Sequence, residues 1–177
     1  MFKTKRDANG DVDRFKARLV AQGYSQEYGV DYDEVFAPVA RYDSIRSVLA
    51  IGTQLNLEIH QMDMKSAFLN GELDEEIFMR QPVGFEDKDH PEKVCRLNTS
   101  LYGLKQSARC WNLVIDSYLK SKHYKQNAAD PCVYYKHEVI NGKDVIVIIA
   151  VYVDDSILCS NVIRVLDAEK KHLSSRF

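Results

Sequence analysis

The sequence predicts a single α+β domain in which helices pack against an antiparallel sheet. Two hairpins support this fold class: one bends at Asn141-Gly142, and the other bends near Asp154-Asp155. The apolar run Val145–Val153 lies between the two bends and predicts a buried strand shared by both hairpins. The third observation is a strongly amphipathic helix over Ala108–Lys122. A chain of 177 residues fits one such domain and can bury a substantial core.

Other elements follow from local signals in chain order. Asn9-Gly10 predicts the tip of a hairpin, and the alternation over Phe15–Ala21 predicts a half-exposed strand with a positive face. Asp43 is expected to cap a helix, and Leu57–Met62 is expected to form a short strand ending at Asp63. Asn161 is expected to cap a last helix. Strands are also expected at Cys132–His137 and Ser156–Cys159.

The apolar face of the 108–122 helix is best interpreted as core packing. Its members lie at helical spacing, one above another on one face: Trp111, Val114, Ile115, Tyr118 and Leu119.

Composition excludes several classes of protein. The net charge of −2 and 45% hydrophobic content are ordinary for a soluble globular domain. The longest apolar run is too short to span a bilayer, and no signal peptide opens the chain, so we expect an intracellular protein, cytoplasmic or nuclear, with no membrane partner. Four scattered cysteines without a CxxC pair predict reduced thiols rather than a zinc site. A local basic stripe is expected to face nucleic-acid phosphates or, equally, solvent: Lys105, Arg109, Lys120, Lys122 and Lys125.

Three carboxylates stand at the ends of apolar strands. Asp63 follows one strand, and Asp154-Asp155 follows the most hydrophobic one. A charge in such a place is costly unless it is solvated, paired or bound to a metal. Clustered carboxylates suit Mg²⁺, but an Asp-Asp pair can also form an ordinary solvated turn, and both interpretations stand on these residues alone.

Four motifs in order resemble those of copia-type retrotransposon reverse transcriptases. The resemblance covers essentially the whole chain. The motifs are Phe15–Gly23 (FKARLVAQG), Gln61–Gly71 (QMDMKSAFLNG), Ser100–Gln106 (SLYGLKQ) and Tyr152–Asp155 (YVDD). Ser107-Ala108 stands where the family commonly has Ala-Pro, which puts the rigidity of the preceding loop in doubt.

The resemblance implies an RNA-directed DNA polymerase site. Asp63 and Asp154 would hold two Mg²⁺ ions, with Mn²⁺ as a second candidate. Asp155 would be a supporting carboxylate, and the carbonyl of Met64 a further ligand. Residues implied for nucleotide binding are Arg18, Ser66, Ala67, Phe68 (an aromatic steric gate), Tyr102 and Gly103, with Lys16 less firmly implied. Those implied for template contact are Leu104, Lys105 and Arg109.

The resemblance also implies a right-hand polymerase fold, with residues 1–177 forming a palm and partial fingers that stop before a thumb and an RNase H domain. Implied partners are a primed RNA or DNA template, deoxynucleoside triphosphates and the rest of a Pol polyprotein, in a virus-like particle, the cytoplasm or the nucleus. An inactive remnant that binds nucleic acid or protein is the alternative. A metal-dependent hydrolase shares paired carboxylates but leaves the four ordered motifs unexplained.

Overall fold

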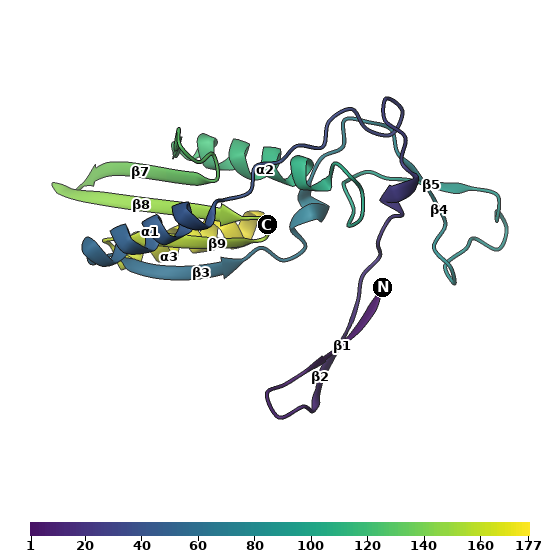
Figure 1. Cartoon of the computed structure of the whole chain (residues 1–177), viewed down its shortest axis with the longest axis horizontal. Helices are drawn as coiled ribbons and strands as arrows, with labels where there is room; N and C mark the ends of the chain where they lie inside the picture. The colour runs from purple at the N-terminus through teal and green to yellow at the C-terminus, as the bar shows by residue number, and fades with distance from the viewer.

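The computed structural model describes residues 1–177 as a central sheet with two outlying hairpins (Figure 1). The five-stranded antiparallel sheet has the order β3-β9-β8-β7-β6, and the hairpins are β1–β2 and β4–β5. The strands are β1 Phe2–Arg6, β2 Val12–Ala17, β3 Glu58–Asp63, β4 Phe78–Arg80, β5 Val94–Arg96, β6 Lys125–Gln126, β7 Val133–Ile140, β8 Lys143–Tyr152 and β9 Asp155–Ser160. The helices are α1 Tyr42–Gln54, α2 Ser107–Ser121 and α3 Ile163–Arg176, with short 3₁₀ turns η1 Gly23–Ser25 and η2 Ala67–Asn70. The α+β class is therefore confirmed.

Helices cover both faces of the sheet. Side chains alternate along β8, so Val147 and Ile149 face the layer formed by α2 and α3, where Ile115 is buried. Ala150 faces the opposite side and packs with Val48 of α1. This two-sided burial explains why β8 is hydrophobic along nearly its whole length. It also confirms that the apolar face of α2 serves core packing.

The β7–β8 hairpin bends at Asn141 and Gly142, as the sequence predicts. Both residues have positive φ, 53° and 75°, which is the pattern of a type I′ turn. This turn closes the end of the sheet remote from Asp154. The β8–β9 bend at the other end contains Val153 and Asp154, because β8 ends at Tyr152 and β9 begins at Asp155. The two bends therefore lie at opposite ends of β8.

Two predicted helix caps are wrong. Asp43 lies inside the first turn of α1, and the carboxylate that accepts the Arg41 N–H at 3.0 Å belongs to Asp130. The Asn161 side chain bonds the backbone of Ile146 and Asp144 rather than the start of α3. Both caps were predicted from neighbouring residues, whereas the hydrogen bonds actually formed join residues far apart in the sequence. The predicted strand over residues 15–21 is also displaced, because β2 ends at Ala17 and the chain then turns toward η1.

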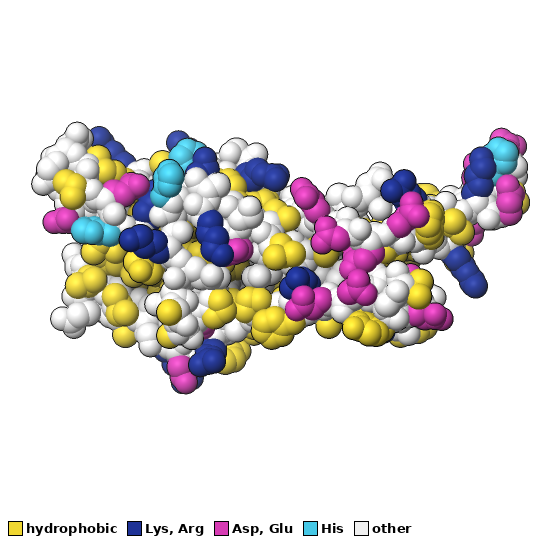
Figure 2. Space-filling view, turned by 90° about the horizontal axis from the view of Figure 1, so that it is seen from above, with side chains coloured by type: hydrophobic (Ala, Val, Ile, Leu, Met, Phe, Trp, Pro, Cys, Tyr) yellow, Lys and Arg dark blue, Asp and Glu magenta, His cyan; other side chains and the backbone are white.

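The segment that leads from the sheet to the β4–β5 hairpin is acidic. Between η2 and β4 the chain contains Glu72, Asp74, Glu75 and Glu76. Acidic side chains gather along the narrow part between the sheet and the β4–β5 arm (Figure 2).

No helix is both long and apolar enough to cross a bilayer. All four cysteines are free, and burial raises the pKa of the Cys132 thiol to about 12, with the nearby Asp130 charge adding to the effect.

Candidate active site

The sheet brings the three carboxylates together at the end where β3 stops and β8 turns into β9, here called the carboxylate edge. Asp63 ends β3, Asp155 opens β9, and their Cα atoms are register partners in the antiparallel β3–β9 pair. Asp154 precedes Asp155 in the β8–β9 bend. The backbone N–H of Met64 donates to the Asp154 carbonyl at 2.7 Å, which fixes the bend against the residue after Asp63. Hydrogen bonding between these elements therefore places the three side chains, although 91 residues separate Asp63 from Asp154 (154 − 63).

Asp63 and Asp154 line one cavity of about 550 Å³. Asp155 is not among the lining residues, and its Oδ1 accepts a hydrogen bond from the Gln61 side chain at 3.1 Å. The supporting role that the resemblance implies for Asp155 stays a prediction. The lining also includes three cations at alternate positions of the chain: Arg14, Lys16 and Arg18. Carboxylates from the sheet and cations from the N-terminal segment thus line the same cavity.

An aromatic stack adjoins this cavity. The Arg18 guanidinium lies 4.9 Å from the centroid of the Tyr102 ring, and Tyr102 packs against Phe68 with centroids 5.1 Å apart. Ser66 lines the cavity, has a positive φ of 57° and immediately precedes η2, which contains Phe68. A cation over an aromatic face is attracted by the ring's quadrupole, so the stack holds Arg18 toward the cavity.

The turn around Gly103 is locked to the N-terminal segment. Gly103 has a φ of +95°, and a Cβ there would lie 2.2 Å from the carbonyl oxygen of Ala21. The Ala21 N–H donates to the Tyr102 carbonyl at 2.7 Å. Glycine is thus required here by positive φ and by close approach of the chain to itself.

Whole-chain comparisons agree on one family. The family model described as reverse transcriptase (RNA-dependent DNA polymerase) matches residues 1–177. The chain belongs to this reverse transcriptase family. It is 44% identical over its full length to the Retrovirus-related Pol polyprotein from transposon TNT 1-94 of Nicotiana tabacum, and covers 13% of that protein.

More distant relatives extend the same pattern. Identity is 40% over the full chain to the Retrovirus-related Pol polyprotein from transposon RE2 of Arabidopsis thaliana, of which the chain covers 12%. Identity is 32% over 99% of the chain to the Transposon Ty1-DR5 Gag-Pol polyprotein of Saccharomyces cerevisiae, with 9% of it covered. The resemblance to copia-type elements is therefore confirmed, and the chain spans about an eighth of the length of its plant relatives. No solved structure matches the chain.

Within this reverse transcriptase framework, the predicted residues divide into two groups. Those lining the carboxylate cavity are Arg18, Lys16, Asp63, Met64, Ser66, Tyr102 and Asp154. Phe68 lies behind Tyr102 and also packs against the main core, and Ala67 is buried at 1% exposure. Leu104 lines a different groove. The family role of Phe68 as a steric gate stays a prediction, because its packing fits the core interpretation as well.

Two predicted template contacts are engaged within the chain. The Lys105 ammonium donates to the Gln26 carbonyl at 3.1 Å and the Tyr32 hydroxyl at 3.2 Å, and Arg109 pairs with Glu34 at 2.9 Å. Both cations hold the N-terminal segment against α2. Their contact with a template stays a prediction that would require these bonds to be shared or exchanged.

Among the charged residues of the cavity, sequence reasoning missed Arg14 and Lys65. Arg14 continues the alternation of Lys16 and Arg18, so the period of two was the signal that could have identified it. Lys65 lies beside Met64 in the aspartate motif and carries no periodic signal of its own. Both add positive charge to the cavity.

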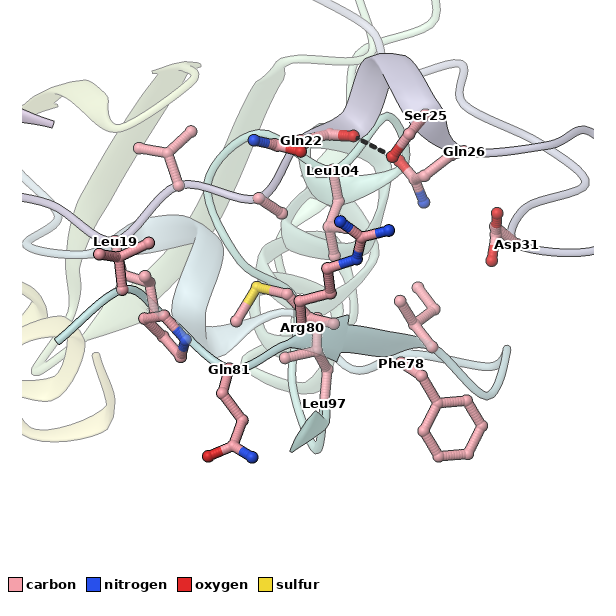
Figure 3. A pocket seen from close by; sticks show the side chains of 16 residues that line it. Leu19, Gln22, Ser25, Gln26, Asp31, Phe78, Arg80, Gln81, Leu97 and Leu104 are labelled. Carbon is pink, nitrogen blue, oxygen red and sulfur yellow. Dashed lines mark hydrogen bonds between the residues drawn. The ribbon is translucent and has the colours of Figure 1, made fainter. Parts of the chain in front are cut away.

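A larger groove of about 630 Å³ lies elsewhere, between residues 19–26 and β4 (Figure 3). Leu19, Leu97 and Leu104 contribute apolar surface, and Arg80 is its single cation. None of the three carboxylates lines it, although Leu19 borders both this groove and the carboxylate cavity.

The donor set at the edge fits hard divalent cations. No group of three or more His, Cys, Asp or Glu side chains is assembled at metal-binding distance. Asp63 and Asp154 offer two carboxylates on one cavity, and Mg²⁺ is commonly held by one or two carboxylates together with substrate phosphates. The residues present therefore fit a cation that is completed by a phosphate ligand.

Proposed function

We propose that this chain is the polymerase core of a copia-type element, catalysing RNA-directed DNA synthesis. The central sheet and its helices would serve as the palm of a right-hand polymerase, and the β1–β2 hairpin as part of the fingers. One observation carries the proposal: Asp63 and Asp154 line the same cavity as Arg14 and Lys16 of β2 and Arg18, which follows β2. A cavity lined by both carboxylates and cations suits a triphosphate, which binds metal ions as well as basic side chains.

Each side chain has a role in the proposed reaction. Asp63 and Asp154 would hold two Mg²⁺ ions. Asp155 would support them by tying β9 to β3 through the hydrogen bond that it accepts from Gln61. When bound, such ions lower the pKa of the primer 3′-hydroxyl and neutralise charge on the phosphates. Arg18 would neutralise the triphosphate, and Tyr102 would support both Arg18 and the incoming base.

The proposed substrates are a primed RNA or DNA template and deoxynucleoside triphosphates. The relatives are named as Pol or Gag-Pol polyproteins, so the natural partner would be the rest of such a polyprotein. The chain covers a small share of those proteins, and its own activity is what the experiment must establish.

The test is primer extension. The purified chain is given a primed RNA template, dNTPs and Mg²⁺ beside an Asp154→Asn variant. We expect extension by the parent chain and a loss of about a hundredfold or more in the variant, because the charge that holds the cation is removed. Asp155→Asn should lose less, since Asp155 does not line the cavity.

Asp144→Asn is the matched control. Asp144 is an exposed carboxylate on the same strand β8, paired with His137 at 2.9 Å at the remote end of the sheet. It should extend primers like the parent. An equal loss of primer extension in Asp154→Asn and Asp144→Asn would contradict the assignment of Asp154. Salt-sensitive RNA binding without any extension would favour the alternative, a remnant that acts as a nucleic-acid-binding module.

A further inference from the structure

The bend that carries Asp154 has an unfavourable backbone. It is a two-residue bend, and Val153 at its first central position has a φ of +59°. Positive φ at the first central residue alone matches a type II′ turn, where glycine is usual. A β-branched residue with positive φ is a genuine outlier, so neighbouring contacts must hold it.

Two elements hold the successive carbonyls of this bend. The Trp111 indole Nε1–H donates to the Val153 carbonyl at 2.7 Å, from helix α2. The Met64 N–H donates to the next carbonyl, that of Asp154. The bend is thus fixed from the helix layer and from the end of β3.

The indole is built into the core. Trp111 is 2% exposed, and the Phe177 ring packs edge-on against it with centroids 5.1 Å apart. A buried indole N–H needs an acceptor, and Val153 supplies it. Core packing fixes the ring, and the ring fixes one carbonyl next to a candidate metal ligand.

We propose that Trp111 is a positioning residue, whose indole N–H holds Val153 at positive φ and thereby aims the Asp154 carboxylate into the cavity. This inference rests on the proposed function, because it assumes that Asp154 binds a divalent cation. Mutation of a residue that orients a metal ligand without touching the metal commonly weakens metal binding by about ten- to a hundredfold.

The test exploits a property of the sequence: Trp111 is the only tryptophan. Biosynthetic replacement of tryptophan by benzothienylalanine, in which sulfur takes the place of the indole N–H, therefore alters this one donor and keeps the size of the ring. Mn²⁺ binding is measured by electron paramagnetic resonance on the full chain, well below its unfolding temperature. We expect roughly tenfold weaker binding in the analogue protein.

A rescue distinguishes positioning from general support of the fold. Glycine adopts positive φ without strain, so Val153→Gly should restore most of the Mn²⁺ affinity in the analogue protein. The control is Tyr134→Phe, which removes another buried aromatic donor, the hydroxyl bonded to Asp116 of the same helix at 2.9 Å. It should leave Mn²⁺ affinity unchanged.

Each outcome has a distinct meaning. If the parent chain shows no Mn²⁺ binding that depends on Asp154, as judged with Asp154→Asn, the proposed function fails and this inference fails with it. If the parent binds and the analogue protein binds equally well, only the role of Trp111 is overturned. Weakened binding that Val153→Gly does not restore, or an equal loss in Tyr134→Phe, would reduce Trp111 to a packing residue.

Discussion

Lys136 and Glu169 form an ion pair inside the protein, where Lys136 lies near the middle of β7 opposite Val147 of β8. Their charged atoms are 3.2 Å apart, and their side chains are 14% and 10% exposed. The Lys136 ammonium also lies 5.0 Å from the centroid of the Tyr124 ring. Burial, and then the nearby Glu169 charge, raise the pKa of the Tyr124 phenol, which stays neutral. Lys136 is therefore the ammonium partner of the buried acid between β7 and α3, and the His172 imidazole lies 3.8 Å from the other carboxylate oxygen of Glu169.

Replacing Lys136 by methionine should lower the free energy of unfolding by about 3 kcal/mol, because it leaves Glu169 buried without its counter-charge. Urea unfolding followed by circular dichroism measures this change. Lys120→Met is the control, since Lys120 pairs with Asp116 at 2.7 Å but is 50% exposed, and an exposed pair contributes less than about 1 kcal/mol. Similar losses in the two variants would mean that burial of the pair is unimportant.

Single residues also show what the sequence could reveal about the site. Asp63 and Asp154 were predicted as partners and do line one cavity, because ordered motifs carry that information. Lys105 and Arg109 were predicted to face a template, yet they bond Gln26 and Glu34. A cation's charge is visible in a sequence, but the partner that it finds is a matter of tertiary structure.

At the scale of elements, the start of helix α1 is held by the carboxylate of Asp130, which lies far from it in the sequence. Asp130 is 4% exposed and accepts N–H groups of Arg41 at 3.0 Å and Cys132 at 2.9 Å. Burial acts to raise the pKa of this carboxyl, but the Ser44 hydroxyl and the two backbone N–H groups lower it overall. The charged form therefore stabilises the start of α1 and the entry to β7 together.

Asp130→Asn should destabilise the protein at neutral pH by about 1–2 kcal/mol. The pH dependence follows from linkage: a carboxyl with a lowered folded pKa stabilises above its unfolded value, near 3.9, and loses this as pH falls through the folded value. The difference in unfolding free energy between parent and variant should thus shrink below about pH 4. Urea unfolding at several pH values measures it, and a difference that stays constant down to pH 2 would contradict this account.

Elements with strong local signals were predictable. The period of α2 and the Asn141-Gly142 turn are written in neighbouring residues, and both occur as expected. Caps were not predictable, since Asp130 lies 89 residues from Arg41 along the chain. The end of β2 was also missed, because the chain leaves the strand to pack against the Gly103 turn, a contact without a local signature.

At the scale of the whole molecule, the N-terminal segment joins the sheet body through one tight junction. Gln106 is buried within it, bonding the Gln26 side chain at 3.0 Å and the Asp31 carbonyl at 2.8 Å. At its centre, Gly23 lies against Gly103. A Cβ on Gly23 would be 1.9 Å from the Gly103 carbonyl oxygen, closer than any real contact. The position of Arg14, Lys16 and Arg18 at the cavity therefore depends on two glycines.

Gly23→Ala should loosen this junction without unfolding the sheet. The methyl group meets backbone rather than a flexible side chain, so one segment must move, at a cost of about 1–3 kcal/mol. Tryptic cleavage after Arg18 should become several-fold faster, while the urea transition of the sheet stays cooperative. Gly29→Ala is the control: its φ is +79° but nothing lies within 4 Å of a Cβ there, so it adds backbone strain alone. Equal acceleration by both variants would mean that flexibility of the segment, rather than contact with Gly103, controls its docking.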